Sequence, residues 1–253
     1  MKRAAFVSNL MQVILVSTGL LAALVLTLLA VRLDVGASLS AMAGSASGSP
    51  FAFSRSLVRA TPLVLCGVGL CLAWKAGMFN IGAEGQYIAG GIAGATIYKL
   101  LAFLPSLPLQ ALILGSAAAG GAALSLLAAW LQAKRGVQVV ISTILLNFIM
   151  VGLLGFAVNG PLKESSGQRP LTDRIPKDLM LWRPFTGLEV NLGVGIALLA
   201  AMGFAVWLYR TKSGFHLRLV GENARAARAS LVPVEMVQMR AMALSGALSG
   251  LAG

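Results

Sequence analysis

The chain has 253 residues, of which 58% are hydrophobic and only 11% are charged, and its mean hydropathy is +0.85. A soluble protein carries about 25% charged residues, so this chain has too few charges to cover a soluble surface. The net charge of +12 comes from lysines and arginines that lie between long apolar runs and form no basic arm, which argues against a nucleic-acid interface. Composition therefore predicts an all-α, polytopic membrane helix bundle whose solvent is the lipid bilayer.

The first apolar run, residues 11–31, contains no charged side chain. A helix needs about 20 apolar residues to cross the hydrocarbon core of a bilayer. This run meets that length and exceeds the apolar core of a signal peptide, which has roughly 7 to 15 residues. We therefore predict a retained first span with Lys2 and Arg3 on its cytoplasmic side.

The next apolar region, residues 60–104, is interrupted by Lys75, by Glu84 and by repeated glycines. Polar, glycine-rich backbone at membrane depth is tolerated only where it is buried in protein or lines a water-filled cavity. The break at residues 79–86 is therefore either part of a substrate path near the midplane or a cytoplasmic turn between two helices. The candidate path residues in it are Asn80, Gly82, Glu84, Gly85 and Gln86.

Two further spans follow the break. Pro105 and Pro108 interrupt the charge-free stretch 100–133, which predicts a helix over residues 109–132. Residues 136–158 form another span, in which Thr143 and Asn147 are four residues apart and so lie on one helix face. Their polar groups suit either a hydrogen bond to a polar solute on the path or a bond to a neighbouring helix.

Loop charge predicts the orientation of the chain. Residues 190–209 form a span, and the segment before it, 159–189, is rich in proline and nearly balanced in charge. The segment after it, 211–235, is basic. Because cytoplasmic loops carry an excess of lysine and arginine, we predict an extracytoplasmic loop at 159–189, a cytoplasmic coupling loop at 211–235 and a cytoplasmic N-terminus.

The cytoplasmic segment contains a short helical pattern at residues 221–231. Asn223 is a good N-cap, the alanines after it favour helix, and Pro233 should end the helix. This predicts about two turns with Arg225 and Arg228 on one face. The pattern fits either a rigid lever received by a partner protein or a solvated positive loop.

The last apolar run, residues 241–253, reaches the chain end after less than a full span, so we expect a chain truncated inside a helix. Glycine pairs four residues apart permit close helix approach, and we assign helix packing to them: Gly90 with Gly94, and Gly246 with Gly250. The sequence contains one histidine, His216, in no metal-ligand pattern, and it contains no G-x-x-x-x-G-K-[ST] phosphate loop. We expect no metal, cofactor or catalytic residue on this chain.

Three segments carry a family resemblance. They read KAGMFNIGAEGQ at 75–86, ISTILLNF at 141–148, and TKSGFHLRLVGENARAARA with LSGALSGLAG at 211–229 and 244–253. In content and order they resemble the permease subunits of ABC importers in the branched-chain amino acid, ribose and nucleoside superfamily, and specifically the branch that handles nucleosides or simple sugars. The sequence departs from the family at Val139, where an acidic residue is usual, and at Ser230-Leu231, where Gly-Ile is usual.

The resemblance implies a type II ABC importer permease fold of about ten helices, of which residues 1–253 form a single transmembrane permease domain holding the first six to seven. It also implies a bacterial inner or plasma membrane location, a second permease subunit, cytoplasmic ATPase subunits that bind ATP, and an extracytoplasmic substrate-binding protein. Residues 79–86 resemble part of the translocation path, and 221–231 resemble a helix that docks on the ATPase. The residues concerned in docking are Gly221, Glu222, Asn223, Arg225 and Arg228.

The function that the resemblance implies is ATP-driven import of a nucleoside or simple sugar by alternating access. The alternative is a self-sufficient secondary transporter or channel for a small polar solute.

Overall fold

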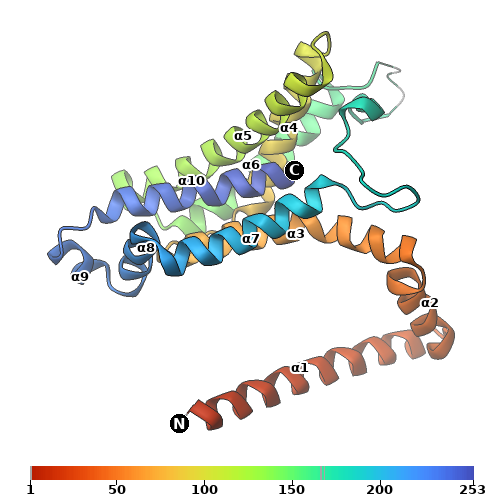
Figure 1. Cartoon of the computed structure of the whole chain (residues 1–253), viewed down its shortest axis with the longest axis horizontal. Helices are drawn as coiled ribbons and strands as arrows, with labels where there is room; N and C mark the ends of the chain where they lie inside the picture. Colours follow the sequence, from red (N-terminus) through yellow and green to blue (C-terminus); the bar gives the residue numbers. More distant parts are fainter. Residues whose placement is uncertain (1, 166, 168) are drawn as a thin grey trace. The chain divides into compact units, whose positions relative to one another are not determined.

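The computed structural model describes residues 2–165, 167 and 169–253, with the side chains of residues 2–10 and 13 outside the description. Residues 166 and 168 of the predicted 159–189 loop therefore lie outside the described residues. All regular structure in the described part is helical (Figure 1), which confirms the all-α prediction. The chain divides into two compact units, Met1–Ser56 and Leu57–Gly253, which are described in turn.

The first unit contains helix α1 (Lys2–Ala30), helix α2 (Val35–Ser47) and the beginning of helix α3, which starts at Pro50. Helix α1 covers nearly all of the run predicted as the first span, and its described apolar part, Ile14–Ala30, has 17 residues. Helix α2 was not predicted. Its small residues form no apolar stripe, and its start depends on Asp34, whose carboxylate accepts a hydrogen bond from the Ala37 N–H at 2.6 Å.

The second unit holds the rest of the helices. They are α3 (Pro50–Lys75), α4 (Ala83–Leu101), α5 (Ser106–Arg135), α6 (Val139–Asn159), the 3₁₀ turn η1 (Lys177–Leu179), α7 (Leu192–Arg210), α8 (Lys212–Glu222), α9 (Ala224–Ala229) and α10 (Val234–Ala252). Among the described residues, four helices are long and apolar enough to cross a membrane: α3, α5, α6 and α7.

The ends of the predicted spans follow local chemistry. Helix α5 begins at Ser106, three residues before the predicted start, because Pro108 falls in the first turn, where the missing N–H has no intrahelical acceptor to lose. The helix ends at Gly136, whose φ of +69° is a left-handed cap. Helix α10 begins at Val234, directly after Pro233 and seven residues before the predicted apolar run (241 − 234).

Helix α10 packs along α5 and α4 (Figure 1), and glycines form the contact. A Cβ atom added at Gly90 would collide with the backbone of Gly250, and one added at Gly121 would collide with the carbonyl oxygen of Gly246. The contact at Gly94 is less tight, since an added Cβ would lie 3.3 Å from the Ile113 side chain. Three of the four glycines assigned to packing thus lie in backbone contact, and Gly121 is an unpredicted member of that contact.

The predicted helix over residues 221–231 is corrected by the structure. Helix α8 runs through Gly221 and Glu222, Asn223 interrupts it with an extended backbone, and α9 is only six residues long. It ends at Ser230, before Pro233, because Leu231 adopts a left-handed φ of +59°. Gly221 and Glu222 therefore belong to the last turn of α8 rather than to the short helix.

Candidate transport site

Helices α3 and α4 are separated by a non-helical segment, residues 76–82, which is called the break from here on; residues 83–86 of the predicted break lie in the first turn of α4. Helix α3 ends in a Schellman motif, in which the Met78 N–H donates to the Ala73 carbonyl at 3.0 Å and the Gly77 N–H donates to the Trp74 carbonyl at 3.0 Å. Gly77 holds the φ of +75° that this motif requires. The glycine thus turns the chain away from α3 and directs the next residues into the bundle.

Asn80 is at the centre of the break and is fully buried. Its amide nitrogen donates to the Gln86 side-chain oxygen at 3.2 Å and to the Ser245 hydroxyl at 3.0 Å. Its amide oxygen accepts from the Gly82 N–H at 2.8 Å and from the Gln86 amide at 3.1 Å. An asparagine side chain offers two donor hydrogens and two acceptor lone pairs, so the hydrogen-bonding capacity of Asn80 is fully used within the protein.

Helix α6 binds the other side of the break. The Asn147 side chain accepts from the Gly85 N–H at 2.9 Å and donates to the Ile81 carbonyl at 3.0 Å. The Thr143 hydroxyl accepts from the Ile81 N–H at 3.3 Å and donates to the Val139 carbonyl at 2.8 Å. The two polar residues on one face of α6 are thus bonded to a neighbouring segment, one of the two roles that their spacing allowed.

Gly82 and Gly85 permit this approach of α6. A Cβ at Gly82 would lie 2.9 Å from the Thr143 Cβ, and one at Gly85 would lie 2.7 Å from the Asn147 amide oxygen. Both glycines are buried. We call Asn80, Gln86, Ser245, Thr143 and Asn147 the amide cluster.

Four of the five residues of the amide cluster are fully buried, and Asn147 is half-buried. Ser245 follows the first residue of α10, Val234, by eleven residues (245 − 234), or about 17 Å of helix at 1.5 Å per residue. Ser249, one turn further along α10, is also fully buried. The side chain of Asn80 therefore reaches a point near the middle of a neighbouring helix.

Glu84 differs from the other candidate path residues because it is exposed. It lies in the first turn of α4, where the helix dipole favours a negative charge. Among the described residues, its carboxylate makes no hydrogen bond and no ion pair, including none with Lys75. Of the candidate path residues with a polar side chain between positions 80 and 86, Glu84 is thus the one whose side chain makes no hydrogen bond within the described structure.

The short basic helix α9 is held by its N-cap and by a small apolar core. The Asn223 side chain accepts from the N–H groups of Arg225 and Ala226, both at 3.0 Å. Ala227 is fully buried in a core with Val220, Val232 and Val234. Arg225 and Arg228 are exposed, so α9 presents positive charge on a surface that is fixed to α8 and to the start of α10.

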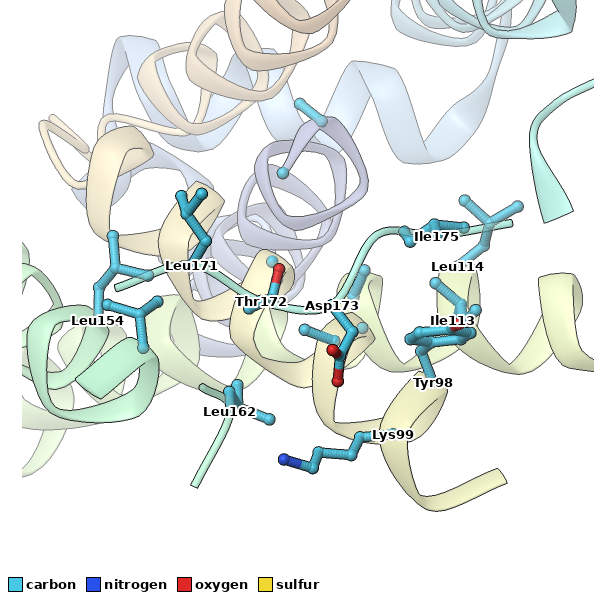
Figure 2. A pocket seen from close by; sticks show the side chains of 18 of the residues that line it. Tyr98, Lys99, Ile113, Leu114, Leu154, Leu162, Leu171, Thr172, Asp173 and Ile175 are labelled. Atoms are coloured by element: carbon cyan, nitrogen blue, oxygen red, sulfur yellow. The ribbon is translucent and has the colours of Figure 1, made fainter. Parts of the chain in front are cut away.

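A cavity of about 670 Å³ lies at the opposite end of α4, and the sequence did not predict it. Figure 2 shows Tyr98 and Lys99 of α4 beside Thr172 and Asp173, which belong to a loop segment that crosses the cavity. Glycines of α4 and the last residues of α10 complete the wall. The volume is within the range of about 300–1,000 Å³ found for small-molecule sites.

The polar groups of this cavity also hold the loop. The Lys99 ammonium donates to the Pro161 carbonyl at 2.8 Å. The Asp173 carboxylate accepts from the Ser165 N–H at 2.8 Å and from the Ser165 hydroxyl at 2.9 Å. These hydrogen bonds, with a smaller contribution from the Lys99 charge, lower the pKa of Asp173 below its ordinary value.

Residues 52–253 match the family described as "Branched-chain amino acid transport system / permease component". The chain belongs to this permease family. Together with the four helices able to cross a bilayer, the match identifies a multi-pass membrane protein and a transport subunit. No group of three or more histidine, cysteine, aspartate or glutamate residues able to hold a metal occurs in the part of the permease that the structure describes.

Relatives of the permease come from both sugar and nucleoside systems. It is 33% identical over 216 residues to a glucose ABC transporter permease protein of Haloferax volcanii, a match that covers 81% of this chain and 56% of the relative. It is 31% identical over 238 residues to a guanosine ABC transporter permease protein of Bacillus subtilis, with coverage of 92% and 67%. It is 27% identical over 217 residues to a nucleoside ABC transporter permease protein of Lactococcus lactis, with coverage of 83% and 60%.

The permease thus spans between about half and two thirds of the length of these relatives. No solved structure matches it significantly.

Proposed function

We propose that this permease is the membrane-spanning subunit of an ATP-driven importer and that it carries a nucleoside or simple sugar across the inner or plasma membrane. The observation that carries the proposal is the family match over residues 52–253, which includes the break, α6 and the α8 to α10 segment. The relatives named for glucose, guanosine and nucleoside transport support the solute class.

The solute path passes beside the break between α3 and α4. Asn80, Gln86 and Thr143 fix the position of the break, because their polar atoms are bonded within the protein. Glu84 faces the path, since a carboxylate at membrane depth is stable only next to water or a polar partner. The 670 Å³ cavity is the vestibule at the extracytoplasmic end, and residues 170–173 of the predicted extracytoplasmic loop line it.

Energy comes from other subunits in this proposal. The chain contains no phosphate-binding loop, so ATP is bound and hydrolysed by cytoplasmic ATPase subunits. Helix α9 docks on them through Asn223, Arg225 and Arg228, and α8 ends beside that surface with Gly221 and Glu222. A second permease subunit and an extracytoplasmic binding protein complete the assembly, with the permease N-terminus in the cytoplasm.

The alternative function is a self-sufficient secondary transporter or channel, and reconstitution separates the two. We would measure uptake of radiolabelled guanosine and glucose into proteoliposomes that contain the full-length permease, its ATPase and its binding protein. The proposal predicts uptake of at least one of these probes that requires internal ATP and all subunits. Uptake by the permease alone without ATP would support the secondary transporter instead.

A further inference from the structure

The last turn of α8 approaches the end of α3 at two glycines, Gly221 and Gly77, where backbone meets backbone. A Cβ atom added at Gly221 would collide with the carbonyl oxygen of Lys75, and one added at Gly77 would lie 3.5 Å from the Cα atom of Gly221. Both residues lack side chains, so no flexible group separates the two backbones. Gly77 is also the left-handed residue that ends α3.

Contacts from α10 and from the side chains of α8 surround this approach. The Gln238 amide of α10 approaches the Ala76 carbonyl at 3.4 Å. Leu217 of α8 is buried in one core with Ala76 and Met78. On its other side, α8 shares the small core of Val220 and Ala227 with α9. Helix α8 therefore contacts both the basic helix and the break.

We propose that Gly221 and Gly77 are positioning residues that transmit displacement of α9 to the break. This inference rests on the function proposed above. A contact between two backbones contains no side chain that can change rotamer to absorb movement. When α9 moves with the ATPase, α8 moves the turn at 75–78, and that turn is covalently continuous with Asn80.

The position of Asn80 in turn sets the start of α4. Its side chain is bonded to Gln86, in the first turns of α4, and accepts from Gly82, the N-cap of that helix. Glu84 lies between them and is exposed. Movement of the 75–78 turn therefore changes the direction in which the Glu84 carboxylate points.

A single methyl group tests the contact. Gly221→Ala adds a Cβ against the Lys75 carbonyl, whereas Gly203→Ala in α7 adds the same methyl group where no atom lies within 4 Å. Each full-length variant is reconstituted with the ATPase and binding protein, and we measure ATPase copurification, ATP hydrolysis and solute uptake. For Gly221→Ala we expect the ATPase to copurify, with the ratio of uptake to ATP hydrolysed reduced about tenfold or more, since a misplacement of about 1 Å can cost two orders of magnitude.

A control variant and three further outcomes determine whether Gly221 transmits the movement. Gly203→Ala should keep the wild-type ratio of uptake to hydrolysis. A wild-type ratio in Gly221→Ala would overturn the inference, and so would loss of ATPase copurification, which would show that Gly221 only shapes the docking surface. Absence of ATP-dependent uptake in the wild type would overturn the proposed function as well, so the two failures are distinguishable.

A distance measurement does not depend on transport. Spin labels at His216→Cys in α8 and Phe79→Cys in the break, both exposed positions, are introduced into a background with Cys66→Ser and Cys71→Ser. If the contact transmits motion, their separation stays constant between the nucleotide-free and ATP-bound complexes, while the separation of His216→Cys from Phe103→Cys changes. A change in the first distance would show that α8 slides over the break and would contradict the inference.

Discussion

The break between α3 and α4 and the cavity at the other end of α4 use polar residues in opposite ways. At the break, Asn80 and Gln86 are buried and bonded to each other. In the cavity, polar side chains such as Thr172 and Tyr98 border about 670 Å³ of open space. Polar residues in an apolar sequence thus have two different roles here: some join the ends of two helices by hydrogen bonds, and others line a cavity.

The burial of a polar side chain distinguishes these two roles, whereas its residue type does not. Asn80 and Glu84 both interrupt the apolar sequence, and both were candidate path residues on that ground. The Asn80 side chain is fully buried and makes four hydrogen bonds, whereas the Glu84 side chain is exposed and makes none among the described residues. Of these two side chains, only Glu84 is free to form hydrogen bonds with a solute or with water.

The largest effect on stability is expected from Asn80→Ala. The change leaves Gln86 and Ser245 without their partner inside the bundle, and an unsatisfied buried polar group costs about 1–3 kcal/mol. We expect the free energy of unfolding to fall by about 3 kcal/mol, measured by SDS titration of the full-length protein. An unchanged unfolding midpoint would show that the amide cluster does not hold the break.

The next largest effect on stability is expected at one of two adjacent glycines in α4. A Cβ at Gly90 would strike the Gly250 backbone, whereas one at Gly91 would lie 3.5 Å from the Gly253 carbonyl oxygen, an ordinary van der Waals distance. Overpacking costs about 1–3 kcal/mol, so Gly90→Ala should lower the unfolding midpoint clearly and Gly91→Ala should leave it nearly unchanged. Equal midpoints for the two variants would show that the backbone contact between Gly90 and Gly250 does not limit the packing of α4 on α10.

The smallest effect is a pH dependence of the loop over the cavity. Because the folded pKa of Asp173 is lowered, its hydrogen bonds to Ser165 stabilise the loop above the unfolded pKa of about 3.9 and lose this effect as the pH falls through the folded pKa. Pepsin should therefore cut the loop faster as the pH is lowered through this range. Because the activity of pepsin also changes with pH, the wild-type cutting rate is divided by that of Asp173→Asn at each pH. This ratio should rise as the pH falls, and Asp178→Asn in the same connection should show the same rise as the wild type.

Much of the fold could be predicted from the sequence, because the length of an apolar run and its lack of charged residues can be read within one segment of the chain. The helices α5, α6 and α7 were predicted to within a few residues, and the interruption between Lys75 and Glu84 was located correctly. Helices α2 and α8 were missed because neither is an apolar run. Thr211, whose hydroxyl accepts from the Gly214 N–H, and the buried pair Leu217 and Val220 were the available signals for α8.

The arrangement of the candidate site depends on contacts that are distant in the sequence. Asn80 and Ser245 are 165 residues apart, and Gly85 and Asn147 are 62 residues apart. Spacing within one segment places residues on a helix face but does not say which segment they meet. For the same reason, the sequence offered no sign that Gly221 touches the end of α3 or that the loop containing Asp173 borders a cavity.

The central claim is that water reaches the side chain of Glu84 but does not reach Ser245 in the amide cluster. Thiol labelling tests this claim directly. Glu84→Cys and Ser245→Cys would be introduced separately into the full-length protein lacking Cys66 and Cys71, and treated in proteoliposomes with a charged, water-soluble thiosulfonate. We predict rapid labelling at position 84 and protection at position 245, which is fully buried. Protection at 84, or equal rates at the two positions, would contradict the account.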